Sequence, residues 1–153
     1  VTYDVLQQLS NEFNVVVVLG STSPHNEMVK NYAENKNIKI IVNANNIGEL
    51  MLEADLAIGA SGSTNWERLC LGLPSLIFTV AENQIQFAKI LDKSRLIKLL
   101  GDVSESGIFD RINKNISTIN DLSAWSERCF NICSCDGTSR VVKIITSEIE
   151  PGK

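Results

Sequence analysis

The chain has 153 residues, of which 44% are hydrophobic and 21% are charged, and its formal net charge at pH 7 is −4. These values are typical of a soluble globular domain with a sizeable core. The acidic balance disfavours a nucleic-acid-binding surface, which needs a basic stripe. The longest apolar runs, such as residues 15–19, are far shorter than the roughly 20 residues of a membrane span. We therefore expect a cytoplasmic protein that neither binds nucleic acid nor spans a membrane.

Apolar, β-branched runs of strand length alternate with helical patterns along most of the chain. In chain order, the predicted strands span residues 14–20, 38–43, 55–60, 75–80 and 96–100. The predicted helices span residues 2–12, 26–35, 46–54, 64–72 and 84–93, and then 104–117, 120–133 and 138–149. Most of the strands are nearly continuous in apolar residues, as is typical of strands that are buried on both faces.

The alternation of strands and helices predicts βαβ units, and therefore an α/β fold with a parallel sheet. Right-handed crossovers place helices on both faces of such a sheet. We expect a three-layer, Rossmann-like sandwich with a five-stranded sheet, formed by one domain over residues 1–150, with residues 151–153 as a tail.

The loop after the third predicted strand is the best candidate for a ligand site. In open parallel sheets, ligands bind beyond the carboxyl ends of the strands. Ser61 and Gly62 have little side-chain bulk, so that another group can approach the backbone closely. Ser63 or Thr64 then begins a helix, whose free N–H groups and positive dipole end favour a phosphate.

Glu67 lies one turn inside this helix, and two roles are open to it. Thr64 and Glu67 match the capping box, in which the glutamate bonds back to the helix start and no ligand is needed. A carboxylate at this position can also accept two hydrogen bonds from a ribose diol, as in dinucleotide-binding folds. Among its neighbours, we expect Trp66 and Leu69 to pack in the core and Arg68 to be solvated or ion-paired on the surface.

The cysteines and the single histidine do not form an obvious metal-binding pattern. Cys129, Cys133 and Cys135 lie close together in the sequence, whereas Cys70 and His25 are far from them. We expect free thiols, with zinc binding or redox chemistry as alternatives. His25 is expected to be an exposed residue at a helix start rather than a catalytic group.

Residues 54–78 read ADLAIGASGSTNWERLCLGLPSLIF, and AENQ follows at 81–84. This stretch resembles the carboxyl-terminal domains of the UDP-sugar hydrolases of pseudaminic acid biosynthesis, which combine a small-residue loop with Trp-Glu-Arg, Gly-Leu-Pro and Asn-Gln. It is also similar to the wider group of GT-B glycosyltransferases, such as the N-acetylglucosaminyltransferase that makes lipid II. The likeness is specific over residues 54–86, and as a topology it extends over about residues 1–100.

The resemblance implies a site for UDP or a UDP-sugar that requires no cofactor and no metal. The residues implied to contact the diphosphate are Ser61, Gly62, Ser63 and Thr64. The carboxylate implied to bind the ribose hydroxyls is that of Glu67. The uracil would lie against residues 43–47, with contacts to Asn43, Ala44 and Ile47. The residues implied to face the sugar are Asn83 and Gln84, with an N-cap as the alternative role for Asn83.

Two departures from the family pattern matter. The family is a two-domain clamp whose amino-terminal half carries the general base, so we expect no catalytic residue in this chain, a missing amino-terminal domain as its partner, and no turnover by the chain alone. The family domain also opens with a central strand that this sequence does not contain. We expect the remaining strands to close up in the order 2-1-3-4-5, the alternative being that another segment or chain supplies the strand.

Three functions are therefore considered. The first is the UDP-sugar-binding half of a hydrolase that releases UDP in the biosynthesis of nonulosonic (pseudaminic-type) acids or surface polysaccharides. The second is the donor-binding half of a GT-B glycosyltransferase, in which an acceptor replaces water. The third is a non-enzymatic module appended to an acylneuraminate cytidylyltransferase.

Overall fold

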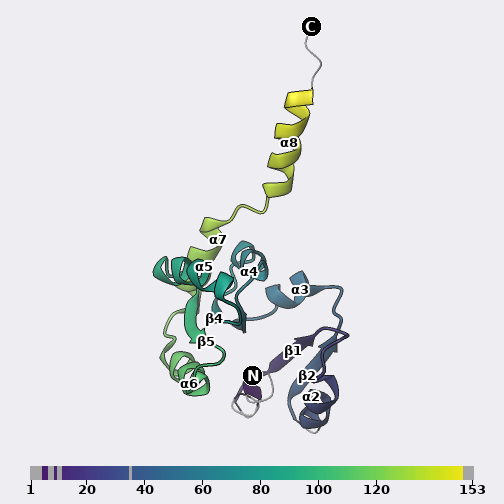
Figure 1. Cartoon of the computed structure of the whole chain (residues 1–153), viewed down its shortest axis with the longest axis vertical. Helices are drawn as coiled ribbons and strands as arrows, with labels where there is room; N and C mark the ends of the chain where they lie inside the picture. The colour runs from purple at the N-terminus through teal and green to yellow at the C-terminus, as the bar shows by residue number, and fades with distance from the viewer. Residues whose placement is uncertain (1–4, 7–8, 10–11, 35, 150–153) are drawn as a thin grey trace.

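A computed structural model describes residues 5–6, 9, 12–34 and 36–149 (Figure 1). All five predicted strands are confirmed, and they are β1 (Val15–Leu19), β2 (Ile38–Val42), β3 (Ala57–Ala60), β4 (Ser75–Thr79) and β5 (Lys98–Asp102). Strand β5 begins two residues later than predicted. The reason is that Leu96 belongs to the preceding turn, where its N–H donates to the carbonyl of Leu91 at 3.0 Å.

The predicted helices are also present wherever the structure describes them. They are α2 (Asn26–Ala33), α3 (Ile47–Leu52), α4 (Thr64–Cys70), α5 (Glu82–Lys93), α6 (Ile108–Thr118), α7 (Leu122–Ile132) and α8 (Gly137–Ile149). Helix α6 begins later than the predicted residue 104, because Gly107 precedes it in a left-handed conformation with φ of 76°. The predicted helix 2–12 lies mostly outside the described residues, although Val5, Leu6 and Leu9 are helical.

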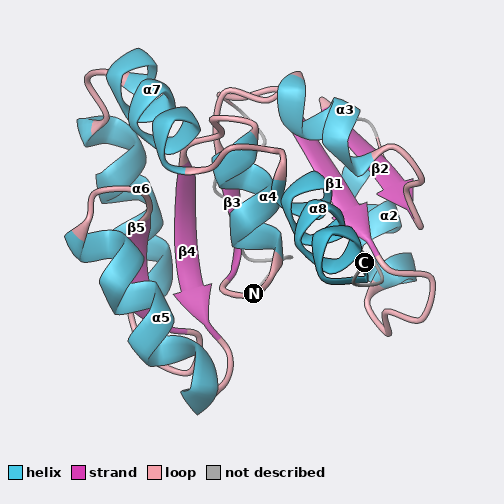
Figure 2. Ribbon diagram, turned by 90° about the horizontal axis from the view of Figure 1, so that it is seen from above, coloured by secondary structure: helices cyan, strands magenta, loops and turns pink. Residues whose placement is uncertain are grey.

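The strands are parallel, as predicted, but they form two sheets instead of one. Among the described residues β1 pairs with β2, and a separate sheet has the order β3-β4-β5 (Figure 2). The predicted single sheet in the order 2-1-3-4-5 is therefore wrong. The amino-terminal segment contributes to the cores of both sheets, because Val5 and Leu9 are buried in the core of the three-stranded sheet while Leu6 is buried against β1 and β2.

Strand β4 lies at the centre of the packing. Leu76 and Ile77 alternate across the sheet, and neither has any exposed surface. Ile77 packs in a core built from α4, α5 and α7, whereas Leu76 packs in a second core that includes α6. Helices therefore cover both faces of the three-stranded sheet, which confirms the layered arrangement there. On the two-stranded sheet, by contrast, Val16 and Val18 remain 49% and 42% exposed.

Helix α8 extends away from the other elements (Figure 1). Four of its apolar side chains are more than half exposed, namely Val141, Val142, Ile144 and Ile145. None of the helices in the described part of the chain combines the length and the apolar character that a membrane crossing requires.

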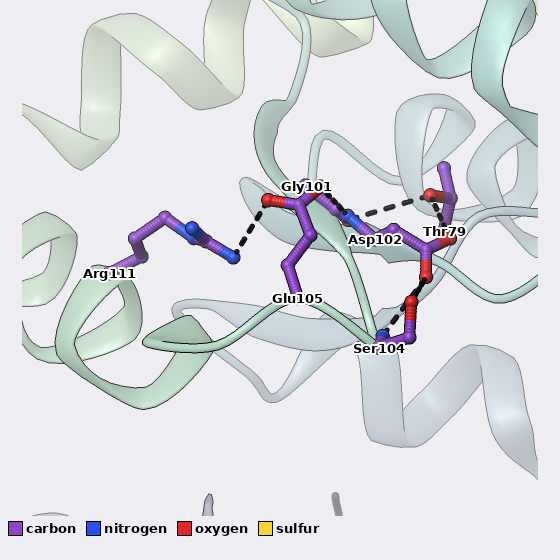
Figure 3. A network of polar contacts seen from close by, with 6 residues as sticks. All are labelled: Thr79, Gly101, Asp102, Ser104, Glu105 and Arg111. Atoms are coloured by element: carbon purple, nitrogen blue, oxygen red, sulfur yellow. Dashed lines mark hydrogen bonds and ion pairs between the residues drawn. The ribbon is translucent and has the colours of Figure 1, made fainter.

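A polar network closes the carboxyl ends of β4 and β5 (Figure 3). The Asp102 carboxylate accepts hydrogen bonds from the Ser104 hydroxyl at 2.6 Å and the Ser104 N–H at 2.9 Å, and from the Thr79 hydroxyl at 3.1 Å. The Asp102 N–H donates to Glu105 Oε1 at 2.8 Å, and Glu105 Oε2 lies 3.3 Å from Arg111 Nη2 of α6. The bonds from Ser104 are the main reason that the pKa of Asp102 is lowered.

Gly72 provides a test of the packing between α4 and α7. It has a φ of 67°, and a Cβ placed on it would lie 3.0 Å from Ser126 Oγ and 3.4 Å from Phe130 Cβ. We expect Gly72→Ala to lower the free energy of unfolding by about 2–3 kcal/mol, because the left-handed conformation and the crowding both oppose a side chain. Urea denaturation measures this change. Gly20→Ala is the matched control, since nothing lies within 4 Å of its added Cβ; equal stability of the two variants would contradict the packing.

The Asp102 network predicts a pH dependence. A carboxyl group whose pKa is lowered by folding contributes stability above its unfolded pKa, and this stability is lost as the pH falls through the folded pKa. We therefore expect Ser104→Ala to raise the pKa of Asp102 toward its ordinary value and to reduce the loss of stability on acidification below about pH 4. Carbon-detected NMR of the Asp102 carboxyl reports the pKa directly. An unchanged titration in the variant would show that Ser104 is not the cause.

Candidate functional site

A cavity of about 460 Å³ lies between α3, α4 and the segment that joins α7 to α8. Its lining residues are Ile47, Gly48 and Met51, then Trp66, Glu67, Cys70 and Leu71, and finally Cys133, Ser134, Cys135, Gly137 and Thr138. The structure thus places Ile47, expected to contact uracil, and Glu67, expected to bind ribose, in the wall of one cavity. A second cavity, of about 390 Å³, lies beside the start of β5 and contains none of the predicted site residues.

Glu67 does not cap helix α4, so the capping-box alternative is wrong. The helix begins at Thr64 and its N-cap residue is Ser63, which makes no side-chain capping bond. Ser63 has φ −58° and ψ −30°, which are helical values, whereas a capping side chain requires an extended N-cap residue. Glu67 lies in the first turn and is exposed, so its carboxylate remains accessible at the cavity wall.

The loop that was expected to bind the diphosphate is only partly accessible. Ser61 is 2% exposed, and its Oγ accepts a hydrogen bond from Asn65 Nδ2 at 3.1 Å, so this hydroxyl is directed toward the protein. Ser63 is exposed and Thr64 is half-buried. No atom lies within 4 Å of a Cβ placed on Gly62, which leaves open space above its backbone. The loop does not line the 460 Å³ cavity.

Arg68 lies beneath this loop and is not the solvated surface residue expected from the sequence. Its Nη1 donates to Asn65 Oδ1 at 3.1 Å, which extends the chain of bonds from Ser61 through Asn65. A Cβ on Gly59 would lie 2.8 Å from Arg68 Nη2, so the guanidinium packs directly on strand β3. Burial lowers the pKa of Arg68, and the nearby Glu67 carboxylate partly opposes this change.

Trp66 also differs from its expected place in the core. It is 48% exposed, its ring centroid is 5.5 Å from that of Phe87 in α5, and it lines the cavity beside Glu67. Leu69 is 1% exposed, which confirms the core position expected for it. A seven-residue helix buries a narrow stripe, here Asn65 and Leu69, so Trp66 falls on the outer side.

The residues between β2 and α3 do not line the cavity. Asn43 is exposed with φ of 56°, and its N–H donates to the Leu19 carbonyl at 2.8 Å. Ala44 is half-buried, and of residues 43–47 only Ile47, the first residue of α3, lines the cavity. Asn46 precedes α3 without a side-chain capping bond; its Nδ2 donates to Glu49 Oε2 at 2.9 Å.

Asn83 and Gln84 lie in the first turn of α5, outside the cavity. The N-cap of this helix is Ala81, so the alternative that Asn83 is the N-cap is wrong. Gln84 Oε1 accepts a hydrogen bond from the Val80 N–H at 3.0 Å, which closes the turn between β4 and α5.

The cysteines are the part of the cavity wall that the sequence did not assign to the site. Cys70, Cys133 and Cys135 all line it, and all four cysteines are free. The dense spacing of Cys133 and Cys135 was the available signal, but their proximity to Cys70 depends on the tertiary packing. Within the described residues, no cluster of three or more potential ligands is arranged to bind a metal ion. His25 is exposed and precedes α2, as expected.

Two relatives share parts of this sequence. The chain is 40% identical to the spore coat polysaccharide biosynthesis protein SpsG of Bacillus subtilis over 77 residues, which are 50% of this chain and 23% of that protein. It is 29% identical to an uncharacterized protein of Methanocaldococcus jannaschii over an alignment of 161 positions, which covers 97% of this chain and 32% of that protein. The chain therefore matches less than a third of the length of either relative.

The family model for the glycosyltransferase family 28 C-terminal domain matches residues 2–121. These residues include all five strands, the loop 61–63 and Glu67. This match covers most of the chain, and the chain belongs to the glycosyltransferase family 28 C-terminal domain family.

Proposed function

We propose that this chain binds the nucleoside diphosphate of a UDP-sugar and forms the donor-binding half of a glycosyltransferase-like enzyme. The family membership supports a nucleotide-sugar ligand, and the name of the Bacillus relative supports a role in polysaccharide biosynthesis. A second domain would then supply the catalytic base and the acceptor. The proposal agrees with the greater length of the relatives.

The observation that carries the proposal is the shared cavity of Ile47 and Glu67. Its volume of about 460 Å³ lies within the range of small-molecule sites. In this arrangement the uracil lies against the end of the loop 43–47, and the Glu67 carboxylate accepts hydrogen bonds from the two ribose hydroxyls. The exposed Trp66 ring provides an apolar wall beside the ribose.

The diphosphate would then extend toward the loop after β3. Open space above Gly62 allows a phosphate oxygen to approach the backbone, and Ser63 and Thr64 can donate hydroxyl hydrogen bonds. Ser61 would act indirectly, because its bond to Asn65 fixes the loop. Asn83 and Gln84 would approach only the sugar, since they lie at the carboxyl end of the neighbouring strand β4.

Two reaction classes fit this donor site. Both break the bond between the anomeric carbon and the diphosphate, and UDP leaves. In a transferase the attacking group is an acceptor hydroxyl, which the family description favours. In a hydrolase it is water, which the Trp66-Glu67-Arg68 and Asn83-Gln84 motifs favour through their resemblance to the pseudaminic acid enzymes. The loop at Gly62 would stabilise the charge that develops on the diphosphate in either reaction.

Titration calorimetry with UDP, UMP and CMP tests the ribose and base contacts. We expect UDP to bind in the high micromolar to millimolar range, about −4 to −5 kcal/mol, and more tightly than CMP. Glu67→Ala should remove about 1.5–3 kcal/mol, because two hydrogen bonds to a charged group are lost. Glu27→Ala is the matched control, since Glu27 is also an exposed glutamate in the first turn of a helix. Equal affinities of the two variants for UDP would contradict the proposed contact between Glu67 and the ribose.

Gly62→Ala tests the diphosphate contact separately. The protein has room for the added methyl group, so we expect an unchanged melting temperature. The methyl group would occupy the space that a phosphate needs, and we expect about a tenfold loss of affinity for UDP, or ~1.4 kcal/mol. UMP, which lacks the second phosphate, should lose less. Gly20→Ala, in the loop after β1, provides the control; a UDP affinity that is unchanged in Gly62→Ala would contradict this assignment.

A further inference from the structure

Three cysteines from two distant parts of the sequence meet at the wall of the cavity. Cys70 is the last residue of α4, and Cys133 follows the last residue of α7. Their Sγ atoms lie 2.7 Å apart. Cys135 is further out and exposed, with its Sγ 3.5 Å from the carbonyl oxygen of Cys70.

The packing of α7 produces this contact. The Leu96 carbonyl accepts hydrogen bonds from Trp125 Nε1 at 2.9 Å and from Cys129 Sγ at 3.1 Å, which ties α7 to the core. Cys133 lies one helical turn beyond Cys129, on the same side of α7. Cys70 is held in place in the same way, because the turn that follows α4 packs against α7 at Gly72. Both thiols are therefore placed by the fold of the domain and not by a loose tail.

Cys129 differs from these three cysteines. It is completely buried, and its thiol already donates to the Leu96 carbonyl. Burial also raises its pKa to about 11. It is a structural thiol, and the half-buried Cys70 and Cys133 are the pair whose sulfur atoms are in contact.

We propose that Cys70 and Cys133 are a redox-active dithiol that a low-molecular-weight disulfide oxidises to an intramolecular disulfide bond between α4 and the end of α7. The inference does not depend on the nucleotide-sugar function. A metal site is disfavoured, because these thiols are not part of any metal-binding cluster among the described residues. Cys70 lies one turn beyond Glu67 on α4, so the bond would fix the wall of the cavity that carries this carboxylate.

The reaction is a double thiol–disulfide exchange. Cys133 loses its proton and attacks the small disulfide RSSR, which forms a mixed disulfide at Cys133 and releases one RSH after that thiolate is protonated. Cys70 then loses its proton and attacks the Cys133 sulfur, the second RS⁻ leaves, and it takes up a proton. In total, two protein thiols are oxidised and RSSR is reduced to two RSH.

The order of attack follows from the contact between the two thiols. The hydrogen bond with the Cys133 thiol is the main reason that the pKa of Cys70 is raised to about 12. Cys70 is therefore a poor first nucleophile at neutral pH. Formation of the mixed disulfide at Cys133 removes that thiol partner, which makes Cys70 the resolving residue.

The full chain, incubated with oxidised glutathione under native conditions, tests the proposal. Intact mass spectrometry should show a product that is two hydrogen atoms lighter, with no retained glutathione. Peptide mapping without reduction should join the peptides of Cys70 and Cys133. The bond closes a long loop, so the melting temperature should rise by about 5–15 °C and return on reduction.

Two variants test which cysteines form the disulfide bond. Cys70→Ser should abolish the lighter product and leave a glutathione adduct at Cys133, whereas the matched variant Cys135→Ser should retain both the product and the rise in melting temperature. The proposal is overturned if the unsubstituted chain retains only glutathione adducts, or if the mapped bond joins Cys135 to either partner. Zinc bound to these cysteines in equimolar amount in the purified protein would overturn it as well. Mapping on the unsubstituted chain decides the question even if a variant fails to fold.

Discussion

The burial of strand β4 on both faces is the constraint on which the rest of the domain depends. Leu76 and Ile77 point in opposite directions, and each is fully removed from solvent in a different core. Complete burial of such side chains contributes about 1.5–3 kcal/mol each. Because β3 and β5 both pair with β4 in parallel, their carboxyl ends lie at one edge of this sheet. The loop at Gly62 and the Asp102 network therefore lie at the same edge of the sheet, on either side of β4.

A short buried chain of polar groups gives the loop after β3 its shape. The Ser61 hydroxyl, the Asn65 amide and the Arg68 guanidinium are linked in sequence by two hydrogen bonds. Buried polar groups are costly unless they are paired, so each member fixes the position of the next. A glycine at position 59 completes the arrangement, because the guanidinium packs where a side chain on β3 would lie. The backbone at Gly62 is thus held by these polar groups on its protein side and has free space on its other side.

The sequence predicted the elements well because their signals are local. Runs of apolar residues between polar loops located every strand to within about two residues. The loop after β3 was selected from its small residues and from its place between a strand end and a helix start. Some failures are local, such as the capping roles considered for Glu67 and Asn83, and the others are tertiary. Trp66 was assigned to the core by its type, but α4 is too short to bury that side as well. Arg68 was assigned to the surface by its charge, although Asn65 provides a buried partner that the sequence pattern does not reveal.

The division into two sheets was unpredictable for a similar reason. The strand periodicity defines which segments are extended, but not which edges meet, and Leu6 and Val5 enter different cores although they are adjacent. The site was predicted in the same partial way. Glu67 and Ile47 were identified separately, and the structure brings them to one cavity. The cysteines in the wall of that cavity meet through the contact between Cys70 and Cys133, which are 63 positions apart. The spacing of cysteines in the sequence could not indicate this contact.

The exposed side of β1 has a consequence for handling the protein. Natural sheets protect their edges with charges, prolines or short strands, whereas β1 reads Val-Val-Val-Val-Leu and, among the described residues, has a partner on one edge only. Apolar segments of this length and composition favour intermolecular strand pairing. Because such pairing joins separate molecules, it increases with protein concentration, and a charged side chain at position 16 or 18 would oppose it.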